Sequence, residues 1–182
     1  MWTVIDDAER PQWDLVPYES VGPLRFGMGL EDVAATMDAQ GFFGSDDVLG
    51  RPHGALAQSV AFRPKGGPLY EQDVVTYHRE SGELAAVAVD ALRGPQVRVD
   101  GVRLIGRVPS QLEEEFVRYA ENRGLERWCL IESEPQSEEL GLLVRVQRAS
   151  DLLLTRAFFV GDFQDWAYTL DDCVPRAEFD FR

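Results

Sequence analysis

A chain of 182 residues, 45% of them hydrophobic and 27% charged, is long enough to bury a core, and its composition excludes intrinsic disorder. The 32 acidic residues outnumber the 18 basic ones, and the net charge of −14 argues against binding to nucleic acid or to an anionic membrane. This charge is compatible with a basic protein as partner, because opposite fields steer association, but an acidic surface that only confers solubility is the simpler interpretation.

The first predicted elements are an extended segment over residues 1–20 and a strand-to-helix turn. The stretch VGPLRFGMGLEDVAATM, residues 21–37, begins as a strand, turns at Gly27 and continues as an amphipathic helix. The apolar positions of that helix follow the spacing of one helical face: Leu30, Val33, Ala34 and Met37. Gly41 is its predicted stop.

The middle of the chain is predicted to be a loop followed by strands. Glycine, proline and aspartate punctuate residues 43–54, which favours a loop, and residues 55–63 favour a strand. Residues 73–91 carry two β-rich runs around the turn Arg-Glu-Ser-Gly, a pattern typical of a hairpin. On a strand over residues 74–79, Thr76 and His78 share one face.

A second amphipathic helix is predicted after the short strand near residues 93–101. Ser110 and Glu113 have the spacing of a capping box, and Gly124 is the predicted end of the helix. A strand, a turn through Pro-Gln-Ser-Glu-Glu and a hairpin-like pair follow. The tail, residues 161–182, holds several aromatic residues, so we expect it to fold back on the body.

These elements predict one domain over residues 1–182 that contains an internal repeat. Residues 21–92 and 99–160 share the order of short strand, glycine turn, helix and strands. We therefore expect an α+β fold made of two pseudo-repeats of helix plus antiparallel strands, with the helices packed on one face of the sheet. The other face of the sheet is then partly open and suited to gripping a partner protein.

No motif in the chain predicts catalysis, a metal or a cofactor. The helix after Gly27 opens with Glu31 and Asp32, which repel the phosphate that a glycine-rich loop would bind. There is no nucleophile elbow and no zinc-protease motif. Cys129 and Cys173 match neither a zinc site nor a redox pair, and whether they form a disulfide stays open. No secretory signal is evident, so we expect a cytoplasmic protein.

Residues 13–37, WDLVPYESVGPLRFGMGLEDVAATM, carry a resemblance to a known group. They resemble the opening of small bacterial proteins built as tandem helix-plus-sheet repeats, which are similar in shape to the β-lactamase inhibitor protein and the small outer-membrane assembly lipoprotein. Many of these proteins look like immunity proteins of toxin systems. The resemblance implies that Gly27 and Met28 seat the turn against the core. The chain departs from the pattern in lacking a lipobox cysteine and in having Gly29 where a serine or threonine cap is usual.

The function that these observations favour is a non-enzymatic protein-binding module, with an immunity protein that neutralises a basic toxin as its specific form. The candidate contact residues are the acids Asp46, Asp47, Glu113, Glu114 and Glu115. One alternative is a small-molecule-binding or enzymatic domain with a pocket between helix and sheet, built from His53, Tyr77, His78 or Trp128. Another is a structural role through a sheet edge, and the oligomeric state stays open.

Overall fold

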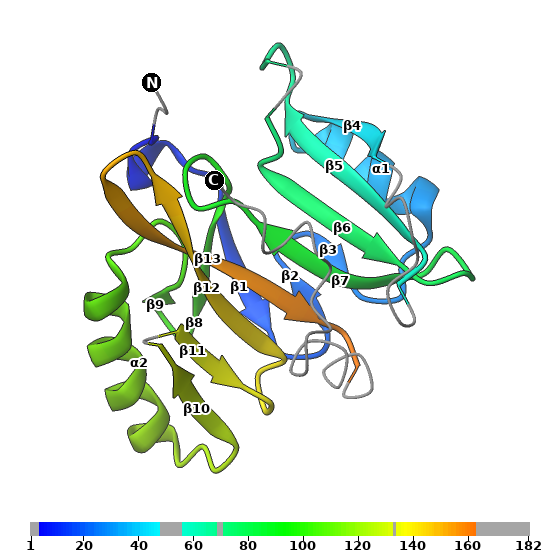
Figure 1. Cartoon of the computed structure of the whole chain (residues 1–182). Coiled ribbons are helices and arrows are strands. Elements are labelled where there is room, and N and C mark those ends of the chain that lie inside the picture. The colour runs from blue at the N-terminus through cyan, green and yellow to red at the C-terminus, as the bar shows by residue number, and fades with distance from the viewer. Residues whose placement is uncertain (1–3, 48–55, 69–70, 133, 163–182) are drawn as a thin grey trace.

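The computed structural model describes residues 4–47, 56–68, 71–132 and 134–162, and of residues 46 and 47 the backbone only (Figure 1). The predicted tail beyond residue 162, His53 and Cys173 lie outside this part of the chain. No helix within the described ranges combines the length and apolar character needed to cross a membrane.

Thirteen strands, two α-helices and one 3-10 helix make up the described part of the chain. In order they are η1 (Asp7–Glu9), β1 (Gln12–Val16), β2 (Ser20–Val21), β3 (Leu24–Arg25), α1 (Leu30–Ala39), β4 (Phe42–Asp47), β5 (Gln58–Pro64), β6 (Val74–His78), β7 (Leu84–Val89), β8 (Gln96–Val99), β9 (Val102–Arg103), α2 (Pro109–Arg123), β10 (Trp128–Ile131), β11 (Glu134–Ser137), β12 (Leu142–Ala149) and β13 (Leu152–Val160).

The larger sheet has eight strands in the order β10-β11-β12-β13-β7-β6-β5-β4. Every neighbouring pair in it is antiparallel. The two runs of four strands meet where β13 pairs with β7, from Ala157 opposite Val89 to Val160 opposite Ala86. Among the described strands, β4 and β10 are therefore the two edges of this sheet.

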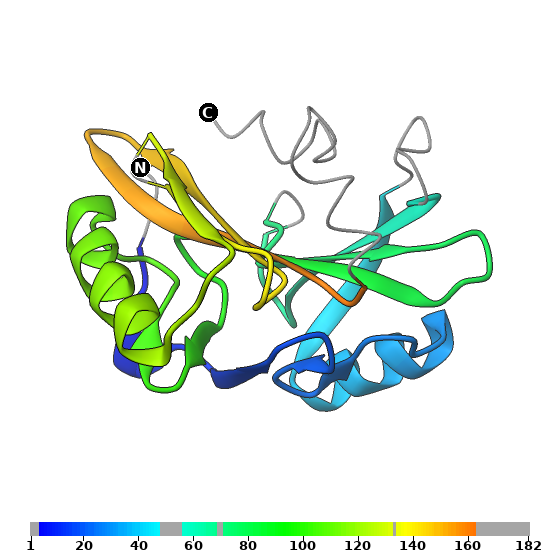
Figure 2. The same cartoon turned by 90° about the horizontal axis from the view of Figure 1, so that it is seen from below.

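The smaller sheet has five short strands in the order β3-β2-β1-β8-β9. Its centre is a parallel pairing of β1 with β8, in which Gln12 lies opposite Gln96. Seen from below, the helices and this small sheet lie on the same side of the eight-stranded sheet (Figure 2). The buried side chains between these layers, among them Trp13, Met37, Phe116 and Phe159, form the larger hydrophobic cluster.

A second hydrophobic cluster lies on the opposite face of the eight-stranded sheet. Phe158 belongs to it while its neighbour Phe159 belongs to the first, because successive strand residues point to opposite faces. Tyr77, Leu143 and Phe158 of this second cluster are buried. The face that was predicted to be partly open is therefore buried at the centre of the sheet.

The predicted α+β class, with two pseudo-repeats of helix plus antiparallel strands, is also wrong. The fold is mostly β, with sheets of five and eight strands and only two helices, of 10 and 15 residues. Amphipathic helices give the strongest periodic signal in a sequence, whereas two-residue strands such as β2 and β9 give none. The pairing of β1 with β8 joins distant segments, and no local pattern encodes it.

The helix boundaries follow the predicted signals in part. Helix α1 starts after Gly29, whose backbone is extended and which offers no side-chain cap. Helix α2 starts at Pro109 with Val108 as its N-cap, so the capping box predicted at Ser110 and Glu113 is wrong. Its end at Gly124 is confirmed, since that residue has the left-handed conformation that glycine tolerates, with φ of 67°.

The turn before α1 is fastened to the start of β7. The Gly27 amide donates a hydrogen bond to the Leu84 carbonyl at 2.9 Å, and the Leu84 amide donates to the Met28 carbonyl at 2.8 Å. The Met28 side chain packs against the larger cluster. These two bonds set the position of α1 beneath the β4–β7 half of the large sheet, where the candidate site lies.

Candidate functional site

A groove of about 650 Å³ lies between α1 and the strands β4, β5 and β6. We call it the α1 groove. The residues that line it are Leu30, Glu31, Val33, Ala34, Ala35, Asp38, Phe42, Phe43, Gly44, Gln58, Val60, Phe62 and His78. Most of these side chains are apolar, and the volume is within the range of ligand-binding clefts.

Small residues on two elements leave the space for this groove. Val33 and Met37 point into the core from α1, whereas Ala34 and Ala35 are exposed and too short to fill the space beside them. On β4, a Cβ atom at Gly44 would lie only 2.9 Å from a ring carbon of Phe62. Glycine at this position therefore lets the Phe62 ring lie close against the β4 backbone.

His78 contributes to the lining of the groove, but both of its ring nitrogens already have partners. Its Nδ1 lies 3.0 Å from the Gly82 carbonyl, and its Nε2 lies 3.0 Å from the Thr76 hydroxyl. A carbonyl only accepts, so Nδ1 carries the proton and Nε2 accepts from Thr76. The shared face predicted for Thr76 and His78 is confirmed. Burial lowers the pKa of His78 and keeps its ring neutral, and the partners of both ring nitrogens favour a structural histidine over a general base.

The rim of the groove is acidic. Asp38 forms an ion pair with Lys65 at 2.8 Å, and both side chains are exposed. Glu31 is exposed as well and forms no ion pair with any residue that the structure describes. An apolar groove with a carboxylate at its rim suits an apolar group that has a positive charge beside it.

The predicted contact residues Asp46 and Asp47 lie on β4, the edge strand that borders this groove. The backbone at these positions pairs with Val60 and Ser59 of β5, so the loop predicted from residue 43 is wrong for residues 43–47, which belong to a strand. Phe43 on the same strand is 52% exposed, and the Arg63 guanidinium lies 4.9 Å from its ring centre.

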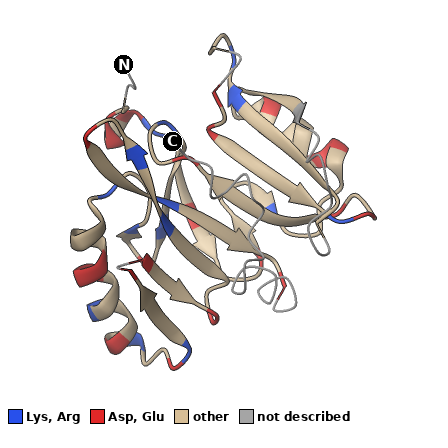
Figure 3. Cartoon of the chain, viewed as in Figure 1, with Lys and Arg blue, Asp and Glu red and all other residues tan. Residues whose placement is uncertain are grey.

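The second predicted acidic cluster, Glu113, Glu114 and Glu115, lies on α2 at the far end of the molecule from β4 (Figure 1). Glu115 pairs with Arg107 at 2.9 Å, and Glu114 pairs with Arg118 at 3.7 Å. Acidic and basic positions alternate along this helix (Figure 3). The structure therefore does not join the two predicted clusters into one surface, and α2 presents no uniformly acidic face.

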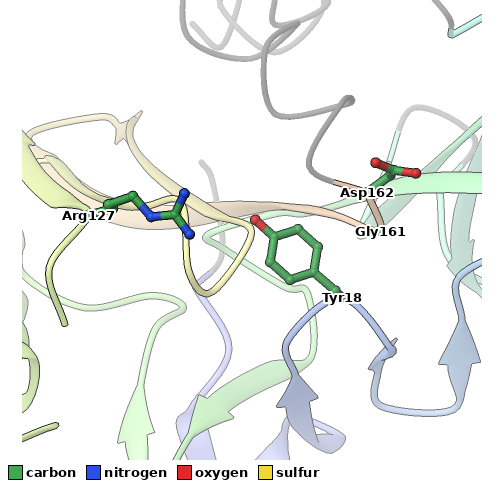
Figure 4. Close-up of a pocket in the computed structure, with 4 residues that line it drawn as sticks. All are labelled: Tyr18, Arg127, Gly161 and Asp162. Atoms are coloured by element: carbon green, nitrogen blue, oxygen red, sulfur yellow. The ribbon is translucent and has the colours of Figure 1, made fainter. Parts of the chain in front are cut away.

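A second hollow, of about 550 Å³, is lined by Tyr18, Arg127, Gly161 and Asp162 (Figure 4). Arg127 pairs with Glu138 at 3.3 Å, and Asp162 lies 3.9 Å from Arg79. The Tyr18 hydroxyl donates to the Glu138 carbonyl. These charges are balanced within the protein, so this hollow offers less for recognition than the α1 groove.

The predicted pocket between helix and sheet was to use His53, Tyr77, His78 or Trp128, and His53 lies outside the described residues. Of the three described residues, only His78 lines the α1 groove. The Tyr77 ring packs at a tilt against Phe158 in the second cluster, and Trp128 packs against Phe116 of α2. Cys129 is a free, exposed thiol on β10, not a buried one.

The residues that sequence reasoning missed are the small ones, Ala34, Ala35 and Gly44. Ala34 was predicted on the apolar face of the helix, but the structure exposes it together with Ala35. Adjacent alanines were the available signal, but alanine is common in helices for reasons of propensity alone. The described residues contain no group of three His, Cys, Asp or Glu side chains close enough to hold a metal ion.

No family model, curated protein or solved structure matches this chain. The resemblance of residues 13–37 to inhibitor-like repeat proteins therefore stays a prediction. What the protein binds has to be argued from the α1 groove and from the strand beside it.

Proposed function

We propose that this protein is a non-enzymatic protein-binding module that receives its partner at the α1 groove and the β4 edge. One observation carries the proposal: an apolar groove lies next to the edge strand of a sheet, so that pockets and backbone groups are available together. Protein recognition commonly combines these two kinds of contact. The partner then takes its affinity from the groove and its orientation from the strand.

The charge of the chain favours a basic partner. The net charge is −14, Glu31 and Asp38 stand at the groove rim, and Asp46 and Asp47 follow on β4. Neutralisation of a basic toxin by an immunity protein is the specific form that we propose, in line with the resemblance at residues 13–37. The cytoplasm is the location that we expect for it.

A selection from a displayed library of random peptides tests this function directly. We expect the selected peptides to bind the wild-type protein and to lose at least about tenfold in affinity with Ala35→Trp, which fills the groove. Ala39→Trp is the matched control, since Ala39 is also exposed on α1 but does not line the groove. This control should bind the peptides as the wild type does.

Charge reversal gives a second test of the same site. Glu31→Lys should weaken the selected basic peptides, whereas Asp32→Lys in the same first turn of α1 should not, because Asp32 does not line the groove. Glu114→Lys on α2 should also leave binding unchanged. Peptides that are equally sensitive to all three changes would contradict the proposed site.

A small-molecule-binding role is the second candidate, favoured by the volume of the groove. A small amine is short enough to bind between α1 and β5 without contacting residues 45–47 at the end of β4. Reversal of Asp46 and Asp47 to lysine separates the two roles, because these positions follow Gly44 along β4, where a bound segment of protein would run on past the groove. It should weaken a protein partner and leave a small amine bound as before.

A further inference from the structure

We infer that the partner binds as an added β-strand on the outer edge of β4, through an extended segment that alternates apolar residues with Lys or Arg. This inference rests on the proposed function and specifies the form of its ligand. It differs from groove binding by a helix or by a single side chain, because it requires hydrogen bonds to the β4 backbone.

The edge of β4 supplies the first argument. This strand has six residues and pairs in regular antiparallel register with β5, from Phe42 opposite Pro64 to Asp47 opposite Ser59. Among the described strands, none pairs with its other side. Alternate residues of an edge strand direct their N–H and C=O groups outward, which forms a template for one more strand.

The α1 groove supplies the second argument. Side chains of an added strand alternate between the two faces of the sheet, so every second one falls on the α1 side. The groove there is lined by Val33, Phe42 and Val60, which favours apolar residues at those positions. The intervening side chains fall on the other face of the sheet, where the net charge of −14 on the chain favours Lys or Arg.

The opposite edge of the sheet is the natural comparison. Strand β10 has four residues, and its aromatic residue Trp128 packs against Phe116 instead of standing at a groove. No described pocket combines β10 with a helix in the way that the α1 groove combines β4 with α1. The β4 edge is therefore the one that offers side-chain specificity as well as backbone pairing.

Charge decides between a second copy of this chain and a different protein as the source of the strand. Two copies with a net charge of −14 repel each other, and a β4–β4 pairing would bring the Asp46 and Asp47 positions of both copies to one interface. A strand rich in lysine or arginine is attracted to the same edge. The segment needs about six to eight residues to follow β4 along its length.

Peptide binding with backbone blocking tests this inference. The probe is an acetylated peptide of about eight alternating valine and lysine residues, compared with a twin in which glutamate replaces lysine. Two further peptides carry N-methyl groups on one or the other set of alternate residues, which removes the N–H donors along one edge only. Affinity is measured by calorimetry, and amide exchange of residues 42–47 is measured by NMR.

We expect the lysine peptide to bind at least about tenfold more tightly than its glutamate twin and to slow exchange at alternate amides of β4. Only one of the two N-methylated peptides should lose this binding. Ala35→Trp should weaken it, and Ala39→Trp should not.

The outcomes separate the inference from the proposed function. Equal tolerance of both N-methylation patterns, or binding that Ala35→Trp weakens without any protection of β4 amides, overturns strand addition while protein binding at the groove stands. Failure of the lysine peptide to bind also overturns strand addition, and the library selection then decides the proposed function on its own. If neither N-methylation nor Ala35→Trp changes the affinity of the lysine peptide, both strand addition and the proposed function at the α1 groove are overturned.

Discussion

The Thr76 hydroxyl and the His78 imidazole lie 3.0 Å apart on β6, and this contact completes the hydrogen bonding of a fully buried histidine. Thr76→Val keeps the shape of the side chain and removes the donor, which leaves Nε2 unsatisfied. We expect the free energy of unfolding to fall by about 1–3 kcal/mol in urea denaturation. Thr36→Val, at a partly exposed site on α1, should change it much less.

The buried position of His78 predicts a pH effect on stability. Its pKa in the folded protein is lower than the usual 6.5, so the unfolded chain takes up the proton first as the pH falls. Stability from this group is therefore present above about pH 6.5 and lost as the pH drops towards the folded-state pKa. His78→Gln should reduce the fall in unfolding free energy relative to the wild type. If the unfolding free energies of the wild type and of His78→Gln fall in parallel with pH, this role of His78 is contradicted.

Asp73 predicts the opposite pH dependence. This carboxyl group is 2% exposed, and burial raises its pKa from 3.8 to about 7 although Arg93 lies 3.7 Å away. The folded protein keeps the proton while the unfolded chain has lost it, so stability falls as the pH rises from about 4 to about 7. At about 1.36 kcal/mol per pKa unit, the change amounts to at most about 4 kcal/mol.

Asp73→Asn should remove that part of the pH dependence, because the amide resembles the protonated acid. Unfolding free energies measured from about pH 4 to about pH 8 should show the variant gaining on the wild type as the pH rises. Asp32→Asn, at an exposed position on α1, is the matched control and should leave the profile unchanged. A variant curve parallel to that of the wild type would show that Asp73 ionises normally.

Gly29 predicts a stabilising substitution. It occupies the N-cap of α1 in an extended conformation, with φ of −71°, and no side chain accepts a hydrogen bond from the first turn. Gly29→Ser supplies that acceptor and restricts the unfolded chain, so we expect a gain of about 0.5 kcal/mol in unfolding free energy. Gly29→Ala restricts the chain without adding the acceptor, and it should gain less. Equal gains would mean that the cap does not form.

Gln96 predicts a large loss of stability. Its side-chain oxygen accepts from the Leu104 and Ile105 amides, and its nitrogen donates to the Ile105 carbonyl and to Asp7. Gln96→Ala leaves buried backbone groups without partners and should cost about 3 kcal/mol in thermal or urea unfolding. Gln12→Ala is the comparison. Gln12 is exposed, so this substitution should lower the free energy of unfolding by less than about 1 kcal/mol. Similar costs at both sites would contradict this account.

Local signals in the sequence identified local structure. The spacing of apolar residues located α1, and the glycine at position 124 ended α2 as predicted. The hairpin over residues 73–91 formed as β6 and β7. Each of these features depends on neighbours within a few positions, which is the range over which side-chain periodicity and turn chemistry act.

The arrangement of the sheets could not be read in this way. The parallel pairing of β1 with β8 and the antiparallel pairing of β13 with β7 each join strands far apart in the chain. Which strands pair depends on the burial of both faces of the sheet, and no local sequence pattern indicates it. Residues 135–137 show how a local prediction fails for this reason. Pro, Gln and Ser favour a turn, but pairing with other strands makes them part of β11.

The candidate site was predicted only in part for the same reason. Asp46 and Asp47 belong to β4, the strand beside the α1 groove, but the glycine and the two aspartates within this strand favoured a loop. Glu113, Glu114 and Glu115 lie on another element, and charge alone could not tell the two clusters apart. Ala35 and Gly44 matter because of the space that they leave, and a sequence records residue size but not empty space.

The pairing of β7 with β13 has a consequence for how the chain is made. β7 is completed at residue 89, but its neighbour on one side, β13, begins only at residue 152. At a synthesis rate of about 5–20 residues per second, the uniformly apolar β7 emerges from the ribosome several seconds before the strand that covers its edge. During that interval the nascent chain carries an unpaired, aggregation-prone edge in the middle of its future sheet. We therefore expect the yield of native protein to depend on protection of this edge during translation as well as on the stability of the finished fold.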